Sequence, residues 1–213
     1  MSIPMRKTLL AAAILSSVVP LLASSYYPAR LDDPKAIYLT QENFAVKGDG
    51  IADDSAVLQQ AINQVQEKTN QGILFVPTGR YRLTRTIYIW PGIRLIGFGA
   101  TRPAFVLAAN TPGFEHGPSY MLFFAGGRPN ANVPPPDASP GTFYSAISNI
   151  DIEIQDGNPG AVGIRAHYAQ HCFLAHMDFH IGSGLAGVHD GGNVAQDLHF
   201  YGGQYGIRTR KPS

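Results

Sequence analysis

Apolar residues first follow a helical period and then a strand period along the chain. Between residues 57 and 65 they fall at i, i+1, i+4, i+5 and i+8, which is one helix face: Val57, Leu58, Ala61, Ile62 and Val65. Asp53, Asp54 or Ser55 can cap this helix, and Gly72 ends it. Later apolar pairs alternate with polar residues: Tyr81/Leu83, Ile87/Ile89 and Ile93/Leu95. A one-faced helix before many short strands predicts a lid on a solenoid, because solenoid ends need a polar cap.

Two columns of residues repeat in the last third of the chain. Ile150, Met177 and Leu198 begin similar runs at offsets of 27 and 21, and Ile164, Val188 and Ile207 follow glycines at offsets of 24 and 19. Periods near 20 to 27 residues, each with two strand registers, predict successive coils whose repeated columns face inward.

The segment from 109 to 142 interrupts this regularity and holds seven of the sixteen prolines. We predict a long loop over the coil surface, with residues 120–124 returning as a strand. Long loops in compact domains are often functional, and passive insertion at a coil corner is the alternative.

Several short motifs resemble one known group of proteins. They are Gly48-Asp49-Gly50, Asp53-Asp54-Ser55, Gln60-Ala61-Ile62, Val76-Pro77, Gly79-x-Tyr81 and Leu95-x-Gly97. Together they resemble the N-terminal domain of the pectate lyase-like superfamily, which includes rhamnogalacturonase- and epimerase-related proteins and phage tailspikes. The resemblance implies an all-β, right-handed parallel β-helix with an N-terminal capping α-helix, acting on or binding polysaccharide.

A second set of motifs is similar to the laminarinase-type exo-β-1,3-glucanases of that superfamily. These motifs are Asn158 to Ile164, Ala169-Gln170 and Gly202-Gly203-x-Tyr205-Gly206. The resemblance implies that the chain is the N-terminal part of a longer protein, with a second β-helix following it. Much of the catalytic apparatus would then lie beyond Ser213.

The first 25 residues have the features of a secretory signal peptide. Arg6-Lys7 precedes an apolar run from Leu9 to Leu22, and Ala23-Ser24-Ser25 supplies small residues for cleavage. The run is shorter than the ~20 residues that span a bilayer, so we expect a secreted or periplasmic protein without a stable membrane anchor. One β-helix domain then occupies residues 26–213.

The amino-acid composition limits the kinds of molecule that the protein is expected to bind. Sixteen Lys and Arg against fifteen Asp and Glu give a net charge of +1, which argues against nucleic acid and allows a polysaccharide. The single cysteine, Cys172, cannot form an internal disulfide, and its apolar neighbours predict a small buried side chain.

Alternate residues of the predicted strands place two polar columns outward: Asp151/Asp178/His199 and Glu153/His180/Tyr201. Neighbouring rungs lie about 4.8 Å apart, so stacked carboxylates can couple and split their pKa values. Such a pair supplies the acid and base of a glycosidase. Asp151, Asp178, Glu153 and His180 are therefore the candidate catalytic residues.

Other interpretations of these columns stay open. The carboxylates can simply face solvent, pair with cations, or bind Ca²⁺, which would favour an eliminase of the pectate lyase type. Arg165, His189 and Arg208 form a further outward column that, with Tyr201, is expected to bind substrate. The histidine spacings lack a zinc motif, and no cofactor other than Ca²⁺ is considered.

The sequence favours a secreted carbohydrate-active protein, most simply a glycoside hydrolase of the β-glucanase kind that uses general acid–base chemistry. A non-catalytic polysaccharide-binding or tailspike-like scaffold is the alternative, alongside the Ca²⁺-dependent eliminase.

Overall fold

The computed structural model describes residues 24–209 apart from 131–132, 139–140 and 192. The expected signal peptide lies outside the described residues except for Ser24 and Ser25. No helix in the described part of the chain is long and apolar enough to cross a membrane.

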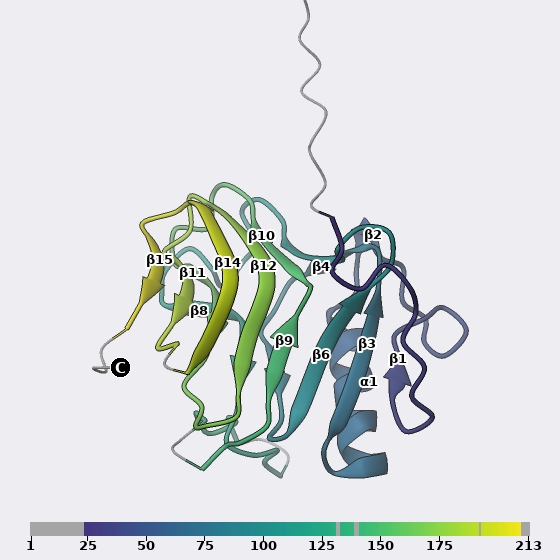
Figure 1. The fold of residues 1–213 in the computed structure, drawn as a ribbon. Coiled ribbons are helices and arrows are strands. Elements are labelled where there is room, and N and C mark those ends of the chain that lie inside the picture. The colour runs from purple at the N-terminus through teal and green to yellow at the C-terminus, as the bar shows by residue number, and fades with distance from the viewer. Residues whose placement is uncertain (1–23, 131–132, 139–140, 192, 210–213) are drawn as a thin grey trace, which may run out of the picture.

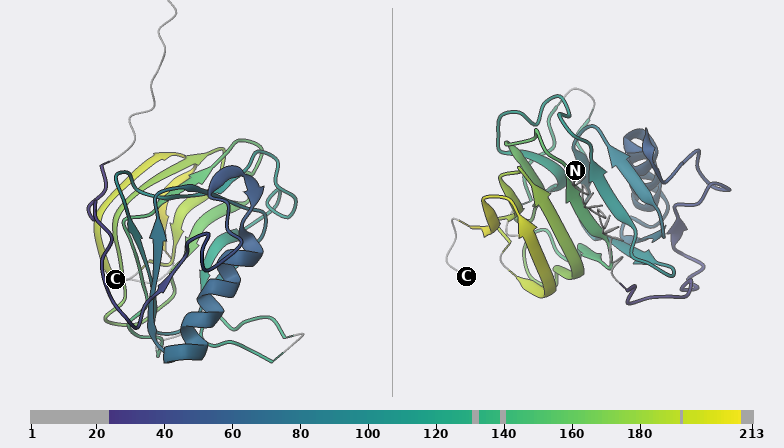
Figure 2. Two further views of the ribbon diagram at one scale, coloured as in Figure 1. Left: turned by 90° about the vertical axis from the view of Figure 1, so that its right-hand side faces the viewer. Right: turned by 90° about the horizontal axis from the view of Figure 1, so that it is seen from above.

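One helix, α1 (Ser55–Thr69), covers one end of the solenoid (Figure 2, left). Its buried face includes Leu58, Ala61, Ile62 and Val65, as the apolar pattern predicted. At its start Asp53 Oδ1 accepts the Ser55 N–H at 3.0 Å, while the Asp54 carboxylate accepts two N–H groups of the preceding turn. The helix ends at Thr69, before Gly72, and its C-cap residue Asn70 has a left-handed φ of 61°. The end predicted at Gly72 is thus slightly late, since Gly72 already begins a strand.

Next to the helix the chain winds into coils that form two parallel sheets (Figure 1). One half of the main sheet contains β1 (Ile37–Tyr38), β3 (Gly72–Pro77), β6 (Ile93–Phe98) and β9 (Ala146–Ser148). The other half contains β2 (Asp49–Asp53), β4 (Arg80–Leu83), β7 (Ala104–Leu107) and β10 (Asp151–Ile154). Two long strands extend across both halves, β12 (Phe173–Gly182) and β14 (Val194–Gly202).

The second sheet contains β5 (Ile87–Ile89), β8 (Ser119–Phe124), β11 (Ala161–Arg165), β13 (Ala186–His189) and β15 (Tyr205–Arg208). Each coil from β3 onward contributes to both sheets, and every pairing between these named strands is parallel. The fold is a right-handed parallel β-helix, which confirms the predicted fold class.

The predicted stacking of coils is confirmed by the strand register. Ile164 pairs with Val188 and Val188 with Ile207, while Met177 pairs with Leu198. Ile152 pairs with Phe179, which is the same offset of 27 that was read between residues 150 and 177. The columns face inward and are buried in the middle coils, but Ile207 in the last described coil is 45% exposed.

The predicted surface loop is partly packed into the fold. Its strand is confirmed as β8, and Phe114 and Ala138 on either side of it are buried. An antiparallel bridge joins Ala125 to Asp137, so the two ends of this excursion are held together beside β8. The buried Cys172 also agrees with its prediction, and burial raises the pKa of its thiol.

A column of left-handed residues crosses the main sheet where β9 gives way to β10. Asn149, His176 and Asp197 have φ values of 59°, 56° and 53° and are spaced as the coils are. Asn149 is fully buried, and its Nδ2 donates to the Gly97 carbonyl at 2.8 Å. A Cβ on Gly97 would lie 1.9 Å from the Asn149 carbonyl oxygen, so only glycine fits there. This column lies between the two halves of the main sheet.

Candidate functional site: a groove of paired carboxylates

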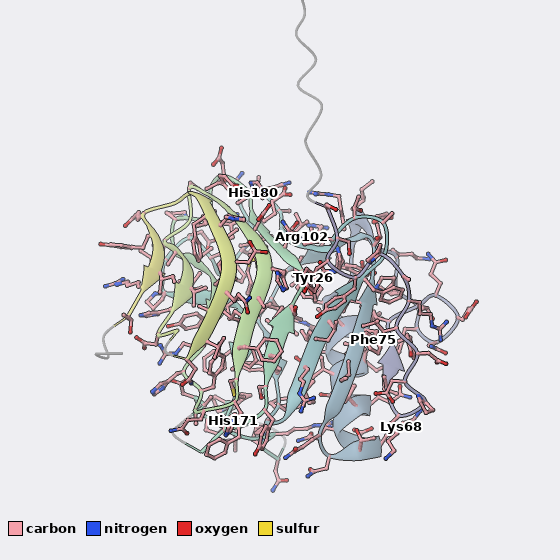
Figure 3. All side chains as sticks on the ribbon, in the orientation of Figure 1. Tyr26, Lys68, Phe75, Arg102, His171 and His180 are labelled. Atoms are coloured by element: carbon pink, nitrogen blue, oxygen red, sulfur yellow. The ribbon has the colours of Figure 1, made fainter. Side chains whose placement is uncertain are left out.

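A groove of about 960 Å³ lies outside the half of the main sheet that holds β4, β7 and β10. We call it the carboxylate groove. It is lined by Thr78, Gly79, Arg80, Thr101, Arg102, Ala104, Asp151, Glu153, Ile154, Gln155, Asp156, Asp178, His180, Gly182 and Tyr201. All four candidate catalytic residues, and Tyr201, therefore lie in one groove. Figure 3 shows Arg102 and His180 at the same end of the main sheet, away from His171.

Arg102 bridges the two stacked aspartates. Its Nε lies 2.8 Å from Asp151 Oδ1, and its Nη2 lies 2.6 Å from Asp178 Oδ2. The three side chains are only 7%, 15% and 13% exposed, so the contacts are largely screened from water. Asp151 Oδ1 also accepts the Asp178 N–H at 2.8 Å. One guanidinium thus holds both carboxylates on neighbouring rungs.

Two effects compete at Asp151. Burial raises the pKa of its carboxyl, and the nearby Asp178 charge raises it further, whereas the Asp178 N–H and Arg102 lower it. The net result is a pKa above its ordinary value. Asp151 therefore retains its proton to a higher pH than an ordinary aspartate does.

Glu153, two residues along β10, is displaced in the opposite direction. Burial raises the pKa of its carboxyl, but hydrogen bonds from Gln155 and Arg80 outweigh this and leave the pKa lowered. Gln155 Nε2 donates to Oε1 at 3.0 Å, and Arg80 Nη2 lies 2.6 Å from Oε2. The two outward carboxyls of one strand therefore differ in their tendency to ionise.

The outer rungs of the groove carry aromatic and imidazole rings. His180 and Tyr201 pair across β12 and β14, and their rings stack with centroids 5.0 Å apart and planes 12° apart. Both residues are exposed. His199 Nδ1 lies 2.9 Å from Asp178 Oδ1, so the Asp178 carboxylate contacts both an arginine and an imidazole.

The other expected substrate-binding residues lie elsewhere. Arg165, His189 and Arg208 do form one column, but on β11, β13 and β15 of the second sheet, and none lines the carboxylate groove. A corner of the solenoid between the two sheets separates this column from Tyr201, and its role in substrate binding stays a prediction. Arg165 pairs with Asp137 and Asp190, and the buried His189 contacts Tyr120 through its Nδ1 at 2.9 Å.

Sequence reasoning missed Arg102 and Arg80. Arg102 lies between β6 and β7, outside any repeated column, so no periodicity pointed to it. Arg80 is the rung neighbour of Ala104, and Ala104 in turn pairs with Asp151. Extending the outward column to the coils before residue 109 would have found Arg80 beside the carboxylates.

Within the described ranges, no group of three or more His, Cys, Asp and Glu side chains is placed to hold a metal ion. Arg102 lies between the two aspartates that could otherwise share a cation. The geometry therefore gives the Ca²⁺ interpretation no support.

Comparison with known families agrees with the geometry of the coils. Residues 42–213 match the family described as rhamnogalacturonase A/epimerase, pectate lyase-like. The chain belongs to this family. This match confirms the resemblance that the sequence motifs indicated.

Individual relatives are distant. A glucan 1,3-beta-glucosidase of Cochliobolus carbonum is 24% identical over 177 residues, which is 71% of this chain and 22% of the relative. The chain thus spans about a fifth of that protein.

Among solved structures, the adhesin PfbA of Streptococcus pneumoniae superposes with a TM-score of 0.52 at 14% identity, over 84% of this chain and 40% of the adhesin. An iota-carrageenase complexed to iota-carrageenan fragments superposes with a TM-score of 0.51 at 15% identity, over 87% and 41%. Both likenesses are likenesses of fold.

Proposed function

We propose that the chain is part of a secreted glycoside hydrolase of the β-glucanase kind, and that the carboxylate groove binds its polysaccharide. The observation that carries this proposal is that two carboxyls of β10, Asp151 and Glu153, line one groove, and their contacts shift their pKa values in opposite directions. Two carboxyls whose surroundings separate their pKa values are suited to acid and base roles. The 24% identity to a glucan 1,3-beta-glucosidase agrees with the choice of substrate class.

In this proposal Asp151 is the general acid and Glu153 the general base. Asp151 gives its proton to the glycosidic oxygen as the bond to the anomeric carbon breaks. Glu153 takes a proton from a water whose oxygen bonds to that carbon. Residues i and i+2 of a strand project to the same face, with Cα atoms about 6–7 Å apart, so both carboxyls can reach one sugar.

Other residues of the carboxylate groove orient this pair or offer a surface to the sugar. Arg102 fixes Asp151 and Asp178, and Arg80 fixes Glu153. The His180 and Tyr201 rings provide a flat exposed surface on which a sugar ring can stack. Secretion, and a second β-helix after Ser213, belong to the same proposal.

The test is release of reducing ends from a β-1,3-glucan by the purified protein. We expect Asp151→Asn and Glu153→Gln each to lower the rate by about 10²–10⁴-fold, the usual contribution of a general acid or base. Both variants should still bind the glucan. An unchanged rate in both variants would refute the acid and base assignment.

A non-catalytic role for the groove is the second candidate. The observation that favours it is that Asp151, Asp178 and Glu153 all contact arginines, an arrangement also typical of a rigid binding surface. Saturable glucan binding without any product from a longer natural chain would favour this role over hydrolysis.

A further inference from the structure

The second sheet carries its own groove, which shares no lining residue with the carboxylate groove. It measures about 380 Å³, and we call it the aromatic groove. It is lined by Thr84, Arg85, Thr86, Tyr88, Pro112, Gly113, Phe114, Pro118, Ser119, Tyr120 and Phe123. Its lining comes from β5, β8 and the segments before them.

Aromatic rings occupy outward positions where a β-helix usually presents polar side chains. Tyr88 and Phe123 are register partners on β5 and β8, and Phe123 pairs in turn with Arg165. The Tyr88 and Phe123 ring centroids lie 5.6 Å apart, and those of Tyr120 and Phe123 also lie 5.6 Å apart. All three residues are half-buried, so part of each ring surface meets solvent. A half-exposed ring gains less free energy from the hydrophobic effect than a ring that points into the core.

The surrounding structure holds these rings in place. Gln59 of α1 accepts the Tyr88 N–H at 2.8 Å and donates to its carbonyl at 3.0 Å. Trp90 stacks beside Tyr88 with centroids 6.0 Å apart and planes 8° apart. Tyr120 is fixed by its hydroxyl contact with His189. The aromatic surface is therefore pre-organised, which lowers the entropy lost on binding.

The charge of this groove differs from that of the carboxylate groove. Among the described residues that line it, Arg85 is the one charged side chain and no carboxylate is present. Ring faces with neighbouring hydroxyls and one exposed guanidinium suit a pyranose, whose C–H faces pack on rings while its hydroxyls accept from arginine.

We propose that the aromatic groove is a second, non-catalytic saccharide site that holds a further stretch of the same polysaccharide. The polysaccharide class rests on the proposed function, whereas the site itself rests on the second sheet alone. Two sites on one rigid solenoid would raise affinity for long chains more than for short ones.

The experiment uses the full chain with Asp151→Asn, so that substrate is not consumed. Trp90, the chain's single tryptophan, is the built-in probe because it stacks on Tyr88. We expect a β-1,3-linked glucohexaose to change its fluorescence saturably. Phe123→Leu, which keeps apolar volume and removes the ring, should abolish that change and weaken binding of long glucan about tenfold, or about 1.4 kcal/mol.

Phe143→Leu is the matched control, since Phe143 is 38% exposed and lines neither groove. Circular dichroism melts verify that each variant is folded, and Arg85→Ala provides a second variant that leaves the core untouched. If Phe123→Leu and Arg85→Ala both bind and fluoresce like the parent, while Tyr201→Leu loses all binding, the second site is refuted and the carboxylate groove remains. If none of the proteins binds glucan, both proposals fall.

Discussion

The two grooves lie on different sheets of one solenoid and differ in what their outward columns present. On the main sheet, carboxylates and arginines pair across rungs, with side chains of Arg102, Asp151 and Asp178 under 16% exposed. On the second sheet, neighbouring rungs present the half-buried rings of Tyr88 and Phe123. The same backbone therefore supports an electrostatic site and an aromatic one.

This difference follows from the way coils are built. Inward positions are constrained by close packing, so both sheets carry similar apolar columns toward the shared core. Outward positions have no such constraint, so the side chains that meet at the rung spacing can differ in chemistry between the two sheets. The consequences of removing a side chain should therefore differ between the two grooves.

The largest expected effect is on the main sheet. Arg102→Ala leaves Asp151 and Asp178 close together without their shared cation, which should cost about 3–5 kcal/mol of unfolding free energy. Urea denaturation near neutral pH measures it. Arg80→Ala is the matched control: its side chain is 46% exposed, so we expect at most about 1 kcal/mol. Equal losses in the two variants would mean that Arg102 is not the organising cation.

A second effect separates the two carboxyls of β10 by their pH dependence. The pKa of Glu153 is lower in the folded protein than in the unfolded chain. Its carboxylate therefore stabilises the fold at a pH above the unfolded-state pKa, and this stabilisation is lost as the pH falls through the folded-state pKa. The pKa of Asp151 is higher in the folded protein than in the unfolded chain. Its protonated carboxyl therefore stabilises the fold at a pH below the unfolded-state pKa, and this stabilisation is lost as the pH rises through the folded-state pKa.

Glu153→Gln should therefore make the acid loss of stability shallower, and Asp151→Asn should make it steeper. Unfolding free energies of the two variants and the parent between about pH 3 and pH 6 test this. The opposite order of slopes would contradict the assignment of Asp151 as the proton-retaining carboxyl.

The smallest effects are expected for the rings. Phe123→Leu should lower stability by less than about 1.5 kcal/mol, because Leu keeps much of the apolar contact. Tyr201→Leu should change stability by about 0.5 kcal/mol or less, since Tyr201 is 51% exposed. Thermal melts compare them. A larger loss for Tyr201→Leu would show that the His180–Tyr201 stack supports the last coils rather than a ligand.

Much of the fold was readable from the chain, and the site was readable in part. The one-faced helix needed only its 3.6-residue period, and the columns through Ile164 and Met177 needed only their repeat. Asp151, Asp178, Glu153 and His180 were found because they lie in those repeats. Arg102 escaped because it belongs to a corner segment, and corners carry no periodic signal.

The sequence by itself determined the winding of this protein, because inward packing repeats every coil and leaves a period in the residues. Only the tertiary structure decided which outward residues meet. In the folded protein Arg165, His189 and Arg208 lie on the second sheet, and Arg102 lies between two aspartates of the main sheet. Contacts made by corner segments depend on the path of the chain in space, and no local pattern of residues records that path.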